Sequence, residues 1–434
     1  MITSRAWAGK RYAVLGLARS GAATVRALAA AGAEVVAWDS DEGRRQAFPS
    51  RKAGKGVAVA DLDTVDLAGF DALVVSPGVP LNTHPLASKA RSADVPVIGD
   101  IELFAEARGG LPAHKVVGIT GTNGKSTTTA LVHHILKVAG VPALMGGNIG
   151  LPILAQEPLP EGGVYVLELS SYQIDLTRSL DCDVAVLLNV TPDHLDRYHG
   201  FEAYAQSKAR LFEMQSSERE AIIAIGDTAS YEIARSLSAR GERLTQIAPG
   251  LCMDQSRWRA LQGPHNAQNA LAAIAVARTL DVPERDIERG LESFTGLPHR
   301  MERVAERDGV VFVDDSKATN PESAAPALGA FGRVHWIVGG RAKGDDLDAC
   351  RPFLDRVAQA YVIGEAGPRF AAVLRDAGVG VEEAGTLESA VNAAAAAARP
   401  GEAVLLSPAA ASFDQFRDYE ERGDRFRALV EALA

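Results

Sequence analysis

Residues 115–126 read Lys-Val-Val-Gly-Ile-Thr-Gly-Thr-Asn-Gly-Lys-Ser, a hydrophobic β-type run that leads directly into a glycine-rich turn. A helical pattern rich in threonine and apolar residues follows as far as Val138. Strand, glycine turn and helix in this order form a phosphate-binding loop, in which backbone N–H groups and the helix N-terminus surround phosphate oxygens. We therefore expect a domain that binds a nucleoside triphosphate.

The turn departs from the GxxxxGK[ST] template, because Ile119 stands at the first glycine position while Gly118 and Gly121 flank it. Lys125 still supplies a cation and Ser126 can bind Mg²⁺. A purely structural glycine turn is the alternative, but the intact Gly-Lys-Ser argues against it. The residues expected to hold ATP phosphates are Gly121, Thr122, Asn123, Gly124, Lys125, Ser126 and Thr127.

The chain has 434 residues, more than the roughly 250–300 residues at which single cores stop growing, so several domains are expected. Apolar β-type runs alternate with helical patterns along its length, which predicts an α/β fold with largely parallel sheets. Turn clusters at Gly109–Pro112 and Gly296–His299 divide it. We predict a Rossmann-like N-terminal domain (1–111), a P-loop ATPase-like central domain (112–298) and a Rossmann-like C-terminal domain (299–434).

Composition limits the partners. Asp and Glu outnumber Lys and Arg by 55 to 45, for a net charge of -10, which disfavours nucleic acid and anionic membranes. The sequence shows no signal-peptide pattern and no apolar run near membrane-spanning length, so we expect a cytoplasmic protein. Cys182, Cys252 and Cys350 lie far apart without a metal-binding spacing, which is typical of reduced core thiols.

The first domain opens with a strand at 11–15, a turn from Gly16 to Gly21, a helix and a second strand that ends at Asp39. This pattern resembles a dinucleotide-binding unit with Asp39 beside a ribose hydroxyl, but Ala18 replaces the middle glycine. Two interpretations stay open: a nucleotide pocket without nicotinamide chemistry, or glycines that only permit tight strand–helix packing.

Two strands downstream of the glycine turn also end in polar groups. The strand at 164–167 leads to Glu168, and the strand at 184–188 leads to His194. A carboxylate at a strand end suits Mg²⁺. Taken alone, however, Glu168 could be a salt-bridge partner, His194 a hydrogen-bonded loop histidine and Lys208 a solvated surface lysine.

In the third domain, strands ending at Asp314, Val338 and Leu406 are followed by lysine and hydroxyl side chains. The ends of parallel strands form one crevice, so these groups suit an amino acid with two carboxylates. The groups are Lys317, Thr319, Lys343 and Ser412. For Lys343, a solvated loop lysine is the alternative.

These motifs together resemble the Mur ligases, which add amino acids to the peptidoglycan precursor. The resemblance covers the whole chain and is carried by Thr120–Ser126, Glu168–Ser171 and the stretch 189–196. Four further motifs resemble the branch of the family that adds D-glutamate: 146–150, 296–300, 314–320 and 407–416. The motif 314–320 argues against a sister Mur enzyme or a folylpolyglutamate synthetase.

The resemblance implies a monomeric enzyme that uses ATP and two Mg²⁺ ions to join D-glutamate to UDP-N-acetylmuramoyl-L-alanine through an acyl phosphate. It implies catalytic roles for Lys125, Glu168, His194 and a carbamylated Lys208, with Ser126, Glu168, His194 and Lys208 holding the metals. The carbamate would make Lys208 an anionic oxygen ligand, which Mg²⁺ prefers.

The remaining implied contacts fall into three groups. Asn266 and Asn269 would meet adenine, with Arg300, Asp315 and Lys317 completing the ATP site. The UDP-substrate contacts would be Leu15, Gly16, Asp39, Ser40, Gly78, Asn148 and Ser170. The D-glutamate contacts would be Thr319, Lys343, Ser412 and Phe413. Asp41 stands where the family has a basic residue and Tyr419 where it has phenylalanine.

Two other classes of function compete with a ligase. An NAD-dependent dehydrogenase built on residues 11–39 would leave the phosphate-binding loop unexplained and is weakened by Ala18. A nucleotide-dependent binding switch would use the loop without ligation, and would release phosphate without needing both an acyl acceptor and an amino acid.

Overall fold

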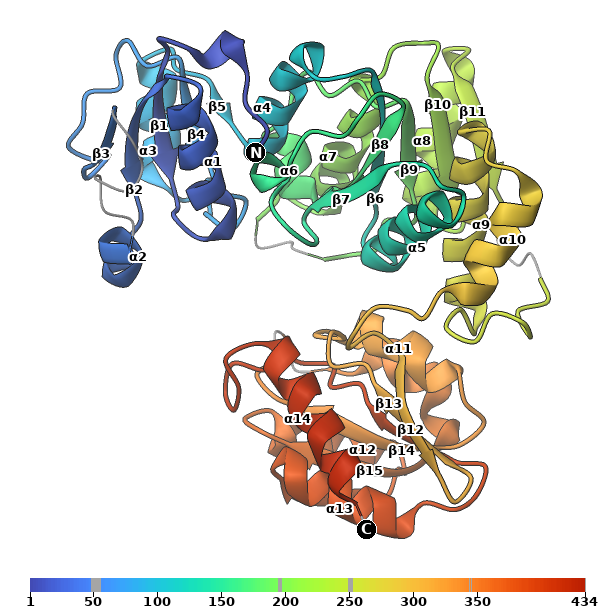
Figure 1. Cartoon of the computed structure of the whole chain (residues 1–434). Helices are drawn as coiled ribbons and strands as arrows, with labels where there is room; N and C mark the ends of the chain where they lie inside the picture. The colour runs from blue at the N-terminus through green and yellow to red at the C-terminus, as the bar shows by residue number, and fades with distance from the viewer. Residues whose placement is uncertain (48–55, 194–196, 249–252, 343, 345, 434) are drawn as a thin grey trace. The chain divides into compact units, whose positions relative to one another are not determined.

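The computed structural model describes residues 1–47, 56–193, 197–248, 253–342, 344 and 346–433. Contacts group the chain into two compact units, residues 1–249 with 268–290 and residues 250–267 with 291–434. The described residues form three sheets, of five, six and six strands, one within each predicted domain (Figure 1). The predicted α/β fold with largely parallel sheets is confirmed, whereas the domain limits at 111 and 298 stay predictions.

The first sheet is wholly parallel and has the strand order β3-β2-β1-β4-β5. Its strands are β1 (Arg11–Leu15), β2 (Glu34–Trp38), β3 (Val57–Val59), β4 (Ala72–Val75) and β5 (Val97–Ile98). Its helices are α1 (Arg19–Ala30), α2 (Glu42–Ala47), α3 (Pro85–Ser92) and α4 (Asp100–Ala107), with 3₁₀ turns at Arg5–Trp7 and Arg108–Gly110.

The central strands β1 and β4 of this sheet are buried on both faces, apart from the exposed first residue of β1. Along β1, Tyr12 and Val14 belong to one hydrophobic core, while Ala13 and Leu15 belong to another. Because successive strand side chains point to opposite faces, a continuous hydrophobic run is required when helices cover both sides.

The central sheet is also parallel, in the order β11-β10-β9-β6-β8-β7. Its strands are β6 (His114–Thr120), β7 (Ala143–Gly147), β8 (Gly163–Glu168), β9 (Val184–Leu187), β10 (Glu220–Ala224) and β11 (Arg243–Ile247). The helices are α5 (Lys125–Val138), α6 (Ser171–Asp175), α7 (Phe201–Glu213), α8 (Thr228–Ala239), α9 (Pro264–Thr279) and α10 (Glu284–Ser293), with a 3₁₀ turn at Ile153–Ala155.

The pairing within this sheet places the glycine turn beside two other strand ends. Strand β6 lies between β8 and β9, with Ile119 opposite Glu168 and Thr120 opposite Leu187. The carboxyl ends of these parallel strands therefore share one edge, which is where ligands bind in open α/β sheets.

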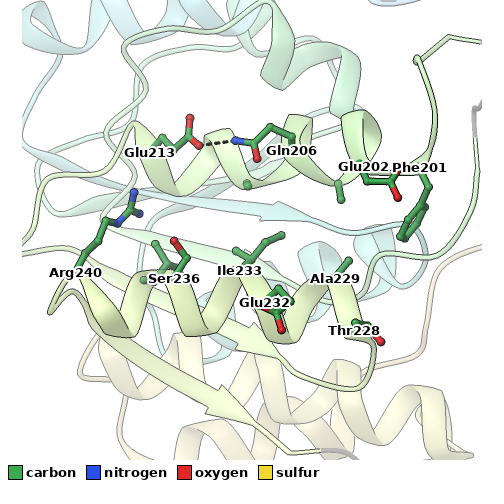
Figure 2. A pocket seen from close by; sticks show the side chains of 13 residues that line it. Phe201, Glu202, Gln206, Glu213, Thr228, Ala229, Glu232, Ile233, Ser236 and Arg240 are labelled. Atoms are coloured by element: carbon green, nitrogen blue, oxygen red, sulfur yellow. Dashed lines mark hydrogen bonds between the residues drawn. The ribbon is translucent and has the colours of Figure 1, made fainter.

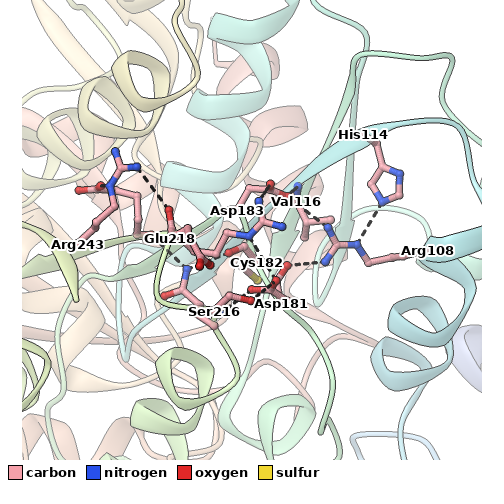
Figure 3. A network of polar contacts seen from close by, with 12 residues as sticks. Arg108, His114, Val116, Asp181, Cys182, Asp183, Ser216, Glu218 and Arg243 are labelled. Carbon is pink, nitrogen blue, oxygen red and sulfur yellow. Dashed lines mark hydrogen bonds and ion pairs between the residues drawn. The ribbon is translucent and has the colours of Figure 1, made fainter. Parts of the chain in front are cut away.

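At the other end of the central sheet, a charged network joins the segment after α4 to this sheet (Figure 3). Arg108 pairs with Asp183 at 3.3 Å, and the same carboxylate accepts a hydrogen bond of 2.8 Å from the N–H of Val116. Arg108 also donates to the carbonyl of Asp181. These bonds hold the connection between the first two sheets.

The third sheet has the order β12-β13-β17-β14-β15-β16, and only the β12–β13 pair is antiparallel. Its strands are β12 (Glu302–Arg307), β13 (Val310–Asp314), β14 (Val334–Gly339), β15 (Val357–Ile363), β16 (Val381–Gly385) and β17 (Ala403–Leu406). The helices are α11 (Pro321–Gly329), α12 (Gly367–Asp376), α13 (Leu387–Ala397) and α14 (Tyr419–Ala432), with a 3₁₀ segment at Asp348–Arg356. Since β13, β17 and β14 are neighbours, the loops that follow them meet at one edge.

Cys182 and Cys350 are buried free thiols, as predicted, and Cys252 lies outside the described residues. Within the described ranges, no helix is both long enough and apolar enough to cross a membrane.

Candidate active site

The glycine turn and the start of α5 form a phosphate-binding loop. Lys125 is the first residue of α5, and its ammonium group donates hydrogen bonds of 2.9 Å to the carbonyls of Gly121 and Thr122. Ser126 is buried in the first helical turn. Gly124 has a φ of +84°, which lets the chain turn into the helix.

Two asparagines hold this loop from neighbouring segments. The side chain of Asn189 accepts a 2.8 Å bond from the N–H of Asn123 and donates one of 3.1 Å to its carbonyl. Asn269, a predicted adenine contact, packs against Gly124. The sequence motif contained Asn189, but its part in shaping the loop depends on tertiary contacts and was missed.

Lys208 lies beneath the same loop and not on the surface. Its side chain on α7 is 1% exposed, and its Nζ donates a 3.0 Å hydrogen bond to the carbonyl of Gly121. The ring of Tyr204 lies 4.5 Å from Nζ. Burial, and next the nearby charge of Lys125, hold the pKa of Lys208 well below its ordinary value. The solvated-lysine alternative is wrong.

Glu168 ends β8 as a buried carboxylate. Its Oε1 accepts a 2.8 Å bond from the side chain of Asn148, while Oε2 has no hydrogen-bond partner among the described residues. It forms no ion pair within that part of the chain, so the salt-bridge alternative receives no support there. His194 lies outside the described residues.

A pocket of about 830 Å³ opens in the first unit at the carboxyl edge of the first sheet. Six predicted UDP-substrate residues line it: Leu15, Gly16, Asp39, Ser40, Gly78 and Asn148. Ser170 does not line it. Its hydroxyl caps the N-terminus of α6, and Gln173, its partner in that cap, lines the pocket.

Asp39 organises the glycine turn of the first domain. Its Oδ2 accepts a 2.6 Å bond from the N–H of Leu17, and its Oδ1 accepts one of 2.9 Å from the N–H of Asp41. Burial raises the pKa of Asp39, but these hydrogen bonds and Arg44 outweigh it, so the pKa lies below its ordinary value. The carboxylate therefore stays charged at neutral pH.

The pocket also contains basic residues that sequence reasoning missed. Arg44 lies in the first turn of α2, three residues after Asp41, and pairs with Asp39 at 3.4 Å. Arg19, at the start of α1, lines the pocket and donates to the carbonyl of Gly150 at 2.9 Å. A search for cations within a few residues of Asp41 would have found Arg44, which supplies a positive charge despite the acidic residue there.

Both interpretations of the first glycine turn have a basis in the structure. A Cβ at Gly21 would overlap the carbonyl oxygen of Gly16, so tight strand–helix packing does require this glycine. Gly16 also lines the pocket. The same residues therefore serve both packing and access to the pocket.

In the second unit, predicted ATP and amino-acid residues follow β13 and β17. Asp315 accepts hydrogen bonds from Ser407 at 2.7 Å and from the N–H of Met301 at 3.1 Å. Burial raises the pKa of Asp315 to about 7. The ammonium of Lys317 lies 3.9 Å from the ring centroid of Tyr419, so this ring is engaged in a cation–π contact.

The other predicted residues of this unit differ in their burial and in their position along the chain. Thr319 is half-buried, Ser412 is buried and Phe413 is exposed, all in loops at the carboxyl edge of the sheet. Arg300 lies just before β12, and Asn266 donates a 3.1 Å bond to the carbonyl of Gln262. Lys343 lies outside the described residues.

Comparison with known families assigns all three parts of the chain. Residues 10–99 match the Mur ligase MurD-like N-terminal domain, residues 119–251 the Mur ligase middle domain, and residues 299–410 the Mur ligase glutamate ligase domain. A protein from Sphingopyxis alaskensis is 63% identical, with 100% of each chain covered. The chain belongs to the Mur ligase family.

That relative, and one from Novosphingobium aromaticivorans that is 61% identical over 100% of this chain and 97% of its own, are named UDP-N-acetylmuramoylalanine–D-glutamate ligase. A solved structure of MurF ligase from Thermotoga maritima in complex with ADP is 18% identical, covers 98% of this chain and 96% of its own, and has a TM-score of 0.60. This structural likeness supports the Mur ligase fold. Family membership also excludes the dehydrogenase alternative.

This Mur ligase has a second groove that contains none of the predicted residues (Figure 2). It has a volume of about 390 Å³ and lies between α7 and α8, with Phe201 near one end and Arg240 near the other. Its chemistry does not match a phosphate or carboxylate site, since Glu202, Glu213 and Glu232 contribute negative charge.

Proposed function

We propose that the enzyme joins D-glutamate to UDP-N-acetylmuramoyl-L-alanine with ATP as the energy source, giving ADP and phosphate. The observation that carries the proposal is the 2.8 Å hydrogen bond between Asn148, which lines the 830 Å³ pocket, and Glu168, which ends a strand beside the phosphate-binding loop. A substrate held in the pocket can thus present its carboxylate near bound triphosphate. The names of the full-length relatives support the choice of substrates.

The proposed reaction has two steps. An oxygen of the alanine carboxylate attacks the γ-phosphorus of ATP, ADP leaves, and an acyl phosphate forms. The amine of D-glutamate then attacks the acyl carbon, the amide bond forms, phosphate leaves and the amine loses a proton. Lys125 and the backbone N–H groups of the loop would hold the triphosphate, so positioning and charge compensation supply most of the catalysis.

The buried residues fit Mg²⁺. The Oε2 atom of Glu168 is a buried oxygen without a hydrogen-bond partner in the described structure, and a hard cation would supply the missing partner. Ser126 and Glu168 would hold one ion, and His194 and a modified Lys208 the second. Bound Mg²⁺ neutralises phosphate charge during phosphoryl transfer.

A carbamate on Lys208 also fits its surroundings. Reaction with CO₂ requires a neutral amine, and the burial of this lysine lowers its pKa and so favours that form. The change converts this amine into an anion beside the cationic Lys125, so that the two side chains attract each other.

The third domain would receive D-glutamate through Thr319, Lys343, Ser412 and Phe413, with Arg300, Asp315, Lys317, Asn266 and Asn269 contributing to ATP. In this scheme residues 1–111 bind the UDP-substrate, 112–298 bind ATP and 299–434 bind the amino acid. A monomeric state and a cytoplasmic location complete the proposal.

Phosphate release from ATP tests it directly. With UDP-N-acetylmuramoyl-L-alanine present, release should require an added amino acid, and D-glutamate should exceed L-glutamate and other D- and L-amino acids. Release without any amino acid would favour the nucleotide-dependent switch, and preference for another amino acid would place the enzyme among its sister ligases.

A further inference from the structure

Arg422 is a buried cation that the proposed mechanism does not use. It lies on α14, and its side chain is among the largest fully buried ones, at 1% exposure. Burial lowers its pKa to about 10, so it remains charged at neutral pH. A buried charge is costly unless it is compensated, which makes its partners informative.

The guanidinium joins two loops that follow neighbouring strands. Its Nε donates to the hydroxyl of Ser316 at 2.9 Å, and one terminal nitrogen donates to the carbonyls of Ser316 at 2.8 Å and Ala410 at 3.1 Å. Ser316 lies between Asp315 and Lys317 in the loop after β13, and Ala410 precedes Ser412 in the loop after β17. The planar fork of arginine suits such simultaneous donation, which a lysine ammonium cannot reproduce in the same geometry.

A third loop lies against the other terminal nitrogen. Gly340, directly after β14, has a φ of +132°, and a Cβ there would lie 3.1 Å from Nη1 of Arg422 and would overlap the carbonyl of Ala411. Nη1 has no hydrogen-bond partner among the described residues. Among the carboxylates that compensate this charge, Asp414 has the largest effect on the pKa of Arg422, and it accepts a hydrogen bond of 2.8 Å from the N–H of Glu365.

We propose that Arg422 is a positioning residue for the ligation, holding the loops after β13, β14 and β17 in the arrangement that receives the amino acid. The inference rests on the proposed function, because the loops after β13 and β17 carry Thr319 and Ser412. The bonded groups are mostly loop carbonyls, which have no sheet or helix partner to hold them in place. Removing the guanidinium of Arg422 therefore frees the loops that surround the amino acid. It leaves the 830 Å³ pocket of the first unit unchanged.

Steady-state kinetics on the full-length enzyme test this, with each of the three substrates varied in turn. Arg422→Met should lower kcat/KM for D-glutamate by about tenfold to a hundredfold, since small misplacements are penalised in the transition state. Arg422→Lys keeps the charge but loses the fork, so it should show a smaller loss of the same kind. KM for UDP-N-acetylmuramoyl-L-alanine should stay within about twofold in both variants.

Arg425→Met is the matched control, because Arg425 lies on the same helix in an exposed ion pair with Glu388 at 3.1 Å. It should behave as the wild type. If Arg422→Met does not fold, the kinetics of Arg422→Lys test the positioning role instead. Wild-type kinetics for D-glutamate in a folded Arg422 variant, or equal losses for all three substrates, would overturn the inference. If the wild-type enzyme prefers another amino acid, the proposed function fails. The role of Arg422 is then tested by comparing the loss of kcat/KM for that amino acid with the change in KM for the UDP-substrate.

Discussion

The Nζ atom of Lys208 donates a hydrogen bond of 3.0 Å to the carbonyl oxygen of Gly121, which ties the middle of α7 to the phosphate-binding loop. The same carbonyl accepts a bond from Lys125 at 2.9 Å. Two lysines thus converge on one carbonyl oxygen of the loop, and burial shifts Lys208 toward its neutral form.

Lys208→Ala should abolish ligation, and formate or acetate should restore part of it by replacing the oxygens of a lysine carbamate. Phosphate release with and without added carboxylate measures both effects. Lys137→Ala is the control, because Lys137 is an exposed lysine on α5 and its loss should change neither quantity. Full activity of Lys208→Ala without carboxylate would remove this lysine from the proposed metal site.

Glu168→Gln should raise the Mg²⁺ concentration needed for half-maximal activity by at least about tenfold, because an amide keeps the shape of the side chain but loses the negative charge. The hydrogen bond from Asn148 can persist, since the amide oxygen still accepts. A Mg²⁺ titration of phosphate release measures the shift, with exposed Glu161→Gln as the control. An unchanged Mg²⁺ dependence would contradict the assignment of Glu168.

Asp39→Asn should raise KM for UDP-N-acetylmuramoyl-L-alanine by about tenfold. The substitution weakens the charge-assisted hydrogen bonds from the N–H groups of Leu17 and Asp41, so the glycine turn that lines the pocket is held less firmly. KM for ATP and D-glutamate should change little. Asp66→Asn is the control, as this exposed aspartate lies in the same domain and accepts a bond from the N–H of Ala68. Equal effects on all three substrates would place Asp39 outside the UDP-substrate site.

His299 should make the stability of the chain depend on pH. Its hydrogen bond with Asp314, 2.7 Å long, raises its pKa above the ordinary value of 6.5 despite burial, with Asp424 and Glu302 adding negative charge. The stabilisation is therefore complete below pH 6.5 and is lost as the pH rises through the higher folded-state pKa.

Thermal unfolding of wild type and His299→Gln at pH values from about 5.5 to 8.5 tests this prediction. At low pH the wild type should unfold at a higher temperature than His299→Gln. This difference between the two proteins should narrow as the pH rises. Exposed His199→Gln is the control and should follow the wild type across the range. A gap that stays constant or widens with pH would show that His299 does not contribute as a cation.

The sequence by itself determined the α/β architecture, the phosphate-binding loop and most of the pocket in the first unit. These features depend on local order: a hydrophobic strand, a glycine turn and a polar residue at the strand end place Lys125, Glu168 and Asp39 at sheet edges before any packing is considered. Parallel pairing then brings such ends together, as the register of Ile119 with Glu168 shows.

Tertiary structure alone decided which polar side chains are buried and what they hold. Lys208 and Arg422 look like ordinary helix lysine and arginine in sequence, yet each is 1% exposed and bonded to loops distant along the chain. Burial is set by segments 87 residues away for Lys208 and 106 residues away for Arg422. No periodicity within a single helix reports on such partners, because desolvation and directional hydrogen bonding arise only when distant loops pack around the side chain.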